Sequence, residues 1–382
     1  MGARLDIPAN GAGNPAPAGT APASDPGPPR RGNGRLDWVD IAKAGAILLV
    51  VVYHVGSNGL SYLTPGSNRA EDVWATINAV LMPVRMPLFF LVSGVLAVGA
   101  IQRPWALVWR KRVGDLLWPF ALWTLLFAAP YALAYAEQSV TGTALEAASW
   151  TPIAAGAYWY LPALAVFFAA AWLLRRTPVV LLVIAVVLWR GAPFIRGAVD
   201  DVIDPDATLT IYRWATFLVW FALGAAARPL IERIAHLPVY VALIAAPLYG
   251  VAAVLVYQHG WSLVPALNVL GLITALIASA QLAKSARMVR LGSYLAKRTL
   301  PIYLIHPILL AIVVSFLGSR VPNVTVLSLV LVPVLVAAFT WLSVSAHDAL
   351  SGKADWLFSL PKRRTSSVPP LPSGIDAAPS RV

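Results

Sequence analysis

The chain has 382 residues, of which 59% are hydrophobic and 12% are charged, and it carries a formal net charge of +12 and no cysteine. This composition is far more apolar than that of a soluble domain and predicts a polytopic membrane protein, while the lack of cysteine excludes disulfides, thiolate nucleophiles and cysteine-ligated metals. We expect the basic excess to reflect membrane topology and not nucleic-acid binding, because Lys and Arg accumulate in cytoplasmic loops.

The two ends of the chain have the composition of cytosolic tails. Residues 1–34 are rich in Pro, Gly and Ala and contain no apolar run, so we expect them to be disordered. They also lack the apolar stretch and cleavage site of a signal peptide. Residues 349–382 carry Lys362, Arg363 and Arg364 and are predicted to form a basic, mostly disordered tail. Residues 35–348 form the predicted transmembrane domain.

Ten apolar stretches approach the roughly 20 residues that a membrane-spanning helix needs, so we predict an all-α fold of about ten spans. They cover residues 38–56, 76–99, 115–136, 157–174, 178–192, 211–227, 238–257, 262–282, 299–317 and 324–346. The fifth stretch is short for a span. An even number of spans puts both ends of the chain on one side, and placing that side in the cytosol leaves few basic loop residues outside. We therefore predict a multi-pass protein of the cytoplasmic membrane with both termini cytoplasmic.

The first predicted span contains ionisable side chains, which are costly in a bilayer and often functional. Asp40 and Lys43 lie near its start, where an i, i+3 ion pair would lower the cost of burying both, and His54 lies near its end. Lys43 and His54 share one helical face about 16 Å apart, with Lys43 towards the cytosol. A ligand with a charged head and a reactive group at the end of an arm, such as acyl coenzyme A, matches this separation.

The second span carries Arg85 just before Pro87, with Ser93 further along the helix. Proline in a spanning helix frees backbone carbonyls that neighbours must satisfy, so we expect a kink beside a cavity. Arg85 either satisfies these carbonyls or an acidic neighbour, or it belongs to a site. We interpret Arg85 and Ser93 as candidate contacts of a bound cofactor-like molecule.

A basic cluster of Arg110, Lys111 and Arg112 precedes the third span. Such a cluster is typical of a cytoplasmic anchor. It also suits a phosphate clamp, because arginine binds phosphate in a bidentate manner. We therefore include these three residues among the candidate contacts of a coenzyme.

Two later spans carry candidate substrate-binding residues. Trp159 and Tyr160 open the fourth span, where aromatic residues either anchor the helix at the interface or stack on sugar rings and lipid headgroups. Tyr303 and His306 lie one turn apart in the ninth span, and His306 is either a structural histidine or part of a site. Patterns typical of metalloproteases, serine hydrolases, P-loops and dinucleotide sites are absent, so we expect no metal and no permanently bound cofactor.

These segments together resemble the acyltransferase-3 family of integral membrane O-acyltransferases. The resemblance covers residues 36–346, nearly all of the membrane portion. It is carried by Asp40, Lys43 and His54 in the first span and by the later segments 86–94 (MPLFFLVSG), 110–119 (RKRVGDLLWP), 159–164 (WYLPAL) and 300–307 (LPIYLIHP). Each segment alone is a modest signal, but five in the expected order are specific.

The resemblance implies about ten spans and transfer of an acyl group, by default acetyl, from acyl-CoA to a hydroxyl of an extracytoplasmic carbohydrate or glycolipid of the cell envelope. His54 matches the family's proposed catalytic histidine, and Lys43 stands where many members have Arg. Arg85 stands where relatives often have His, and Asp115 interrupts the basic stretch where a second Arg is often found. A neutral His54 would act as general base on the acceptor hydroxyl, and a covalent acyl-histidine relay is the other route.

Two other functions use the same residues. A transporter or flippase of a saccharide or lipid intermediate would place Lys43, His54, Arg85 and His306 along a substrate path. The lack of inverted-repeat signs and of intramembrane acidic residues in the later spans counts against it. A noncatalytic partner in an envelope complex would use the motifs for packing alone.

Overall fold

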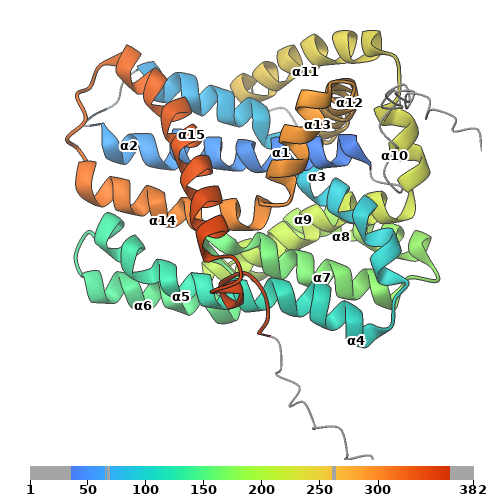
Figure 1. Cartoon of the computed structure of the whole chain (residues 1–382), viewed down its shortest axis with the longest axis horizontal. Helices are drawn as coiled ribbons and strands as arrows, with labels where there is room; N and C mark the ends of the chain where they lie inside the picture. The colour runs from blue at the N-terminus through green and yellow to red at the C-terminus, as the bar shows by residue number, and fades with distance from the viewer. Residues whose placement is uncertain (1–35, 65, 67–68, 260–263, 362–382) are drawn as a thin grey trace, which may run out of the picture. The chain divides into compact units, whose positions relative to one another are not determined.

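The computed structural model describes residues 36–64, 66, 69–259 and 264–361, and all regular secondary structure in these ranges is helical (Figure 1). The predicted tail 1–34 and the basic residues Lys362, Arg363 and Arg364 lie outside the described residues. Contacts divide the chain into Met1–Leu36 and Asp37–Val382, and the fold below belongs to the second unit.

Within the described ranges, nine helices are long and apolar enough to cross a membrane, and a tenth span results if one bent pair is counted as a single span. The chain is therefore an all-α, multi-pass membrane protein, as the hydropathy pattern predicts. The side of the membrane on which each end lies stays a prediction. The long helices are α1 (Asp37–Tyr53), α3 (Arg69–Ile101), α5 (Asp115–Tyr135), α8 (Pro178–Val199), α9 (Pro205–Ala226), α11 (Val239–His259), α12 (Val264–Leu282), α14 (Thr299–Leu317) and α15 (Thr325–Leu350).

Most of the long helices and one bent pair differ from their predicted bounds by several residues. The chain continues from α1 through a π-helical turn (His54–Gly59) into α2 (Leu60–Leu63), and α4 (Trp105–Val108) reaches α5 through a second π-helical turn (Trp109–Gly114). The basic cluster at 110–112 therefore lies within a helical segment. The predicted short fifth span is the full-length α8.

The bent pair consists of α6 (Val140–Ile153), a 3₁₀ turn (Gly156–Tyr158) and α7 (Tyr160–Leu173), with an 85° bend between its halves. The hydropathy pattern predicts only the second half as a span, preceded by a loop. Ala154 adopts a left-handed backbone conformation with φ of 55°, and Gly156 has φ of 73°, so the chain turns sharply here. α6 then lies against α5.

Polar cap residues mark where two of the helices, α13 and α9, begin. Ser285 caps α13 (Ala286–Ala296), which is amphipathic and lies across α1. Asp204 caps α9 by accepting hydrogen bonds from the backbone N–H groups of Asp206 (2.8 Å) and Ala207 (3.1 Å), and Pro205 occupies the first helical position. The short amphipathic helix α10 (Arg228–Ala235) begins without a side-chain cap and has a proline in its first turn.

α1 lies among the other helices and contacts α3, α12, α13, α14 and α15. Its buried side chains include Trp38, Ile47 and Val51, which come from different sides of the helix. A helix that is apolar on all sides suits burial in the interior of a membrane bundle. The polar residues of α1 therefore face other protein segments and not only lipid.

α3 and α9 cross at two glycines. A Cβ atom at Gly94 would collide with the backbone oxygen of Phe221, and one at Gly224 would collide with that of Leu91. Small residues permit such close backbone approach between membrane helices. Because α3 carries Arg85 and α9 carries Arg213, this crossing fixes the relative depth of the two arginines.

A neighbouring helix satisfies the carbonyl that Pro87 frees in α3. Pro87 has no N–H, so the carbonyl of Pro83 loses its intrahelical partner. With its amide nitrogen turned towards α3, Asn268 of α12 donates to Pro83 O at 3.0 Å. α3 stays helical through both prolines.

After α15 the chain forms a strap, residues 351–361, that returns over α5. The indole N–H groups of Trp118 and Trp123 donate to the carbonyls of Trp356 and Leu357, each at 2.7 Å. The N–H of Leu360 donates to Asp115 Oδ1 at 3.0 Å. The domain boundary predicted at residue 348 thus falls inside α15, and the first part of the predicted basic tail has a defined structure.

Candidate active site

His54 occupies the point where α1 changes its winding. The regular helix ends at Tyr53, and His54 begins the π-helical turn His54–Gly59. Such turns are frequent at functional sites, because one extra residue per turn redirects side chains. Nδ1 of His54 lies 3.0 Å from the carbonyl of Val50.

His54 contacts His306 of α14, with 3.1 Å between His54 Nδ1 and His306 Nε2. Nδ1 of His306 lies 2.8 Å from the carbonyl of Ile302. A carbonyl only accepts, so His306 carries its proton on Nδ1 and accepts on Nε2. His54 therefore donates its Nδ1 proton to His306 and Val50, and a neutral His54 has its lone pair on Nε2.

His54 lines a cavity of about 510 Å³, which we call the His54 cavity. Its wall contains hydroxyl, amide and aromatic groups from α1, the π-helical turn, α2, α5 and α6, and the guanidinium of α9. These residues include Tyr53, Ser57, Asn58, Tyr131, Tyr135, Trp150, Trp159 and Arg213. The Trp150 indole donates to Asp206 Oδ2 at 2.9 Å, which fixes this part of the wall.

Two arginines lie close to His54. The guanidinium carbon of Arg85 lies 4.1 Å from the centroid of the Tyr53 ring, and Arg85 is 6% exposed. The guanidinium carbon of Arg213 lies 5.0 Å from the centroid of the Trp159 ring. Both are cation–π contacts, which partly compensate for lost hydration.

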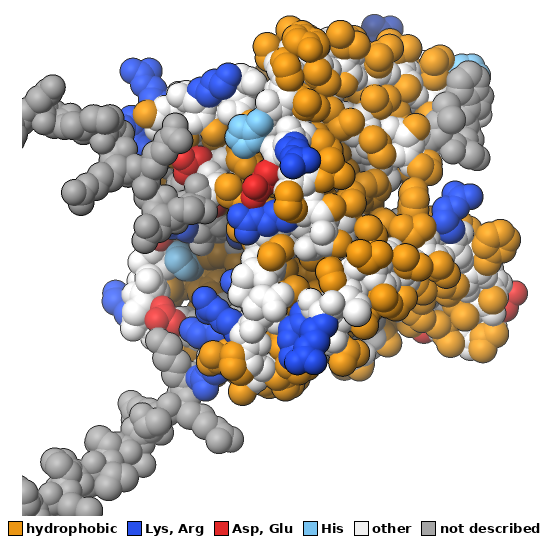
Figure 2. All heavy atoms as spheres, turned by 90° about the vertical axis from the view of Figure 1, so that its right-hand side faces the viewer, with side chains coloured by type: hydrophobic (Ala, Val, Ile, Leu, Met, Phe, Trp, Pro, Cys, Tyr) orange, Lys and Arg blue, Asp and Glu red, His pale blue; other side chains and the backbone are white. Residues whose placement is uncertain are grey.

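A second cavity of about 320 Å³ contains Lys43, and we call it the Lys43 cavity. Its cationic wall consists of Lys43, Lys111 and Arg112, whereas Phe89 and Leu164 are among its apolar residues. Phe358 and Ser359 of the strap complete the wall. Figure 2 faces the end of the bundle at which α1 begins, where several Lys and Arg side chains gather.

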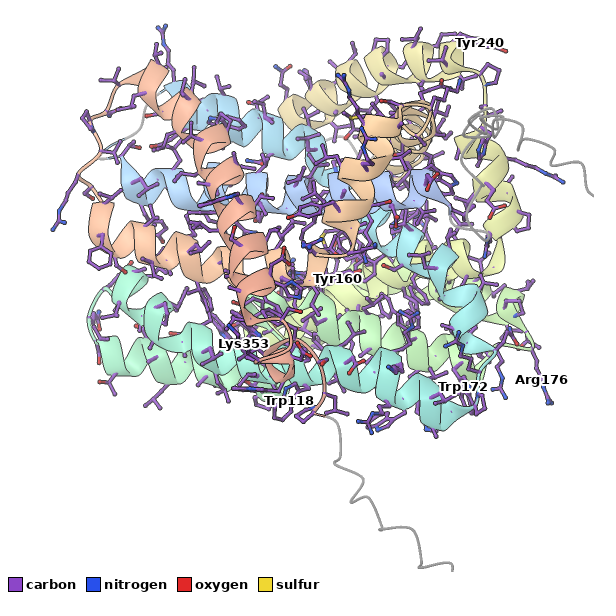
Figure 3. The ribbon with its side chains drawn as sticks, in the orientation of Figure 1. Trp118, Tyr160, Trp172, Arg176, Tyr240 and Lys353 are labelled. Carbon is purple, nitrogen blue, oxygen red and sulfur yellow. The ribbon has the colours of Figure 1, made fainter. Side chains whose placement is uncertain are left out.

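Tyr160 and Tyr303 lie between the two cavities. Both are buried, and both line the Lys43 cavity. Tyr160 OH lies 3.0 Å from Ser93 Oγ, while Tyr303 OH donates at 2.9 Å to the carbonyl of Ala157, a residue of the His54 cavity. Figure 3 shows Tyr160 in the interior of the helix assembly, whereas Trp172 and Arg176 lie at its edge.

Most of the predicted site residues fall into two groups. The Lys43 cavity contains the predicted residues Lys43, Ser93, Lys111, Arg112, Tyr160 and Tyr303. His54 and Trp159 line the His54 cavity, and His306 contacts His54.

Three predicted site residues do not line the cavities that contain the residues predicted together with them. Asp40 accepts a hydrogen bond from Ser293 of α13 at 2.9 Å and is not among the residues that line either cavity. Arg110 is directed to the carbonyl of Pro361 in the strap, at 3.4 Å. Arg85 lies beside Tyr53, near His54, and not in the Lys43 cavity with the other predicted coenzyme contacts.

The site also contains parts that the sequence does not predict, namely Tyr53, Asn58, Arg213 and the strap. Arg213 had a usable signal, because it lies inside the predicted span 211–227, where an ionisable residue is costly. Phe358 had none, since its place depends on the chain returning to α5 after α15.

Comparison with known proteins agrees with the motifs. The sequence matches the model of the acyltransferase-3 family, described as an acyltransferase domain, over residues 36–347. It is also similar to the inner membrane protein YcfT of Escherichia coli strain K12, with 36% identity over 90 residues, which are 22% of this chain and 25% of YcfT. The chain thus aligns with a quarter of that relative's length. No solved structure matches it. The family match includes every cavity residue named above except those of the strap.

Proposed function

This chain belongs to the acyltransferase-3 family of membrane proteins, and from that premise we propose that it is an O-acyltransferase that uses acyl-CoA. The acceptor is a hydroxyl group of an extracytoplasmic carbohydrate or glycolipid of the cell envelope, and acetyl is the expected acyl group. The observation that carries the proposal is the pair of cavities that Tyr160 and Tyr303 separate, one cationic and one with an oriented histidine.

The Lys43 cavity suits the donor. Lys111 and Arg112 supply positive charge for the phosphates of coenzyme A, and arginine in particular matches phosphate in geometry. The apolar side chains Phe89 and Leu164 suit the pantetheine arm behind the phosphates. In this arrangement Lys43 lies further along the arm, and the thioester reaches the tyrosine pair at the far end.

The His54 cavity suits the acceptor. A hydroxyl placed at His54 Nε2 loses its proton to that nitrogen as its oxygen attacks the thioester carbonyl carbon. The tetrahedral intermediate then collapses, the carbon–sulfur bond breaks, and the coenzyme A thiolate takes the proton from His54. His306 holds the other ring nitrogen and so orients His54 as a positioning residue.

The tyrosine pair favours group transfer over transport. Tyr160 of α7 is held by a hydrogen bond with Ser93 of α3, and Tyr303 of α14 is held by one to Ala157 of the 3₁₀ turn. A narrow thioester arm needs only a small opening between them, whereas a whole saccharide needs a much wider one. This difference supports the acyltransferase over the transporter or flippase.

The test is a comparison of wild-type protein with His54→Ala. Membranes from cells that express either protein receive radiolabelled acetyl-CoA, and the labelled envelope lipids and glycans are then separated. We expect a discrete labelled product with the wild type and a reduction of at least about 100-fold with His54→Ala, because general-base catalysis contributes on that order.

The control is His236→Ala, because His236 is exposed and its Nδ1 contacts only the backbone of α10. This variant is expected to retain the wild-type product. Equal labelling by wild-type and equally abundant His54→Ala protein would contradict the proposed role of His54 and favour the transporter.

A further inference from the structure

The proposed acyl transfer leaves Arg85 and Arg213 without a role. Neither arginine belongs to an ion pair among the described residues. Nη1 of Arg85 is also fully buried and has no hydrogen-bond partner there. A guanidinium removed from water without an anion is unfavourable, and such residues at membrane depth usually serve a ligand.

Arg85 is not needed to repair its own helix. The carbonyl that Pro87 frees is satisfied by Asn268 of α12. The contact of Arg85 with the Tyr53 ring is a cation–π interaction, which leaves the guanidinium N–H groups available for an acceptor. This excludes the structural role that the sequence alone left open for it.

The packing of α3 and α9 puts the two arginines at similar depths. Phe90 stacks on Phe217, and both residues precede the crossing at which Gly94 meets Phe221 and Gly224 meets Leu91, so the two helices run in the same direction. Arg85 and Arg213 also precede the crossing glycine of their own helix, by nine and eleven residues respectively. Both arginines therefore stand on the Tyr53 side of the glycine crossing, one on each helix.

The His54 cavity provides no protein anion for them. Among the described residues that line it are hydroxyl groups, one amide, aromatic rings and Arg213, but no carboxylate. The neighbouring carboxylate of Asp206 is not among the lining residues; it accepts from Trp150 and interacts with Arg213 electrostatically but forms no salt bridge with it. The cavity is thus positively charged next to the imidazole.

We propose that the acceptor is an anionic carbohydrate or glycolipid whose phosphate or carboxylate group binds at Arg213, with Arg85 as the second positive charge. This inference rests on the proposed acyl transfer and adds the class of acceptor. The planar guanidinium of Arg213 matches either oxyanion in a bidentate manner. Its binding holds a hydroxyl of the same molecule at His54 Nε2.

The first measurement is the charge of the labelled product. The product that depends on His54 is isolated from membranes given radiolabelled acetyl-CoA and is applied to an anion exchanger at neutral pH. We expect the exchanger to retain the labelled product. Phosphate analysis and carbodiimide modification of carboxylates then distinguish the two sources of charge. An uncharged product would overturn the inference while leaving the acyl transfer intact, and no His54-dependent product at all would count against the acyl transfer itself.

The second measurement uses the deacylated product as acceptor for purified protein. Arg213→Gln is expected to raise the KM for the acceptor at least about tenfold and to leave the KM for acetyl-CoA unchanged. The acceptor KM of Arg213→Lys is expected to lie between those of Arg213→Gln and the wild type. The control is Arg196→Gln, because Arg196 is half exposed and lies near Asp200 on α8. A fall in kcat with an unchanged acceptor KM would overturn the inference and assign Arg213 to the transition state.

Discussion

The partner of a catalytic histidine decides how much positive charge the histidine can hold. In serine hydrolases an aspartate orients the imidazole and stabilises its protonated form. Here His306 is a neutral acceptor, because its own Nδ1 is bonded to the carbonyl of Ile302. His306 therefore orients His54 with little charge stabilisation. We infer that the proton spends little time on His54 and passes on to the leaving thiolate.

A His306 substitution tests this orientation. His306→Leu removes the acceptor for His54 Nδ1, and we expect kcat to fall on the order of tenfold to a hundredfold, the range seen when partners that orient an imidazole are removed. His306→Gln retains an acceptor oxygen and is expected to recover part of that loss. Steady-state kinetics with acetyl-CoA measures both variants, and a Leu variant with wild-type kcat would assign His306 to packing alone.

Some individual site residues could be predicted from the sequence, because burying a charged side chain in a membrane is costly. Lys43 and His54 were identified because ionisable residues in an apolar helix require a reason. The same argument applies to Arg213, which was overlooked as a residue near the end of a span. The His54–His306 contact was not predictable, since the two residues are 252 positions apart and meet only when α14 lies against α1.

At the scale of elements, the glycine crossing between α3 and α9 links packing to the site. Gly94 and Gly224 allow backbone contact, and the arginines extend from the same two helices. A side chain at the crossing must push the helices apart or slide one along the other. Either movement changes the distance between Arg85 and Arg213.

Gly224→Ala tests the crossing, and Gly99→Ala is its control, because a Cβ at Gly99 in α3 meets nothing within 4 Å. We expect Gly224→Ala to destabilise the protein by about 1–3 kcal/mol through overpacking. Gly99→Ala is expected to be neutral or slightly stabilising, because alanine favours the helix. The apparent melting temperature of the purified protein in detergent measures the difference. Equal melting temperatures for the two variants would mean that the crossing tolerates a methyl group.

At the scale of the whole molecule, hydropathy predicted the helical class and most spans, because a bilayer demands long apolar helices. It could not predict α6 or the 85° bend before α7, which depend on the backbone conformation of Ala154 and Gly156 and on the contact of α6 with α5. The strap was missed for a similar reason. Residues 351–361 are too few to form a span, and contacts with residues distant in the sequence, such as Trp118, Trp123 and Asp115, give them a fixed place.

The strap brings the end of the described chain to the cavity that contains Lys43 of α1. Phe358 and Ser359 form part of the cavity wall, and the N–H of Leu360 donates a hydrogen bond to one carboxylate oxygen of Asp115. Asp115 is thus a structural anchor among basic residues in the expected donor site. If the cavity binds acyl-CoA, the strap must be in position for the donor to be held, whereas the acceptor in the His54 cavity does not depend on it.

The double variant Trp118→Phe/Trp123→Phe tests this dependence, because it keeps an aromatic ring at both positions and removes the two N–H donors. Each lost hydrogen bond costs about 0.5–1.5 kcal/mol, so we expect the KM for acetyl-CoA to rise about tenfold and the KM for the acceptor to stay unchanged. Trp341→Phe is the control, since Trp341 is 67% exposed on α15. If both Michaelis constants rose together, the strap would support the bundle as a whole. If neither changed, the donor would bind without the strap.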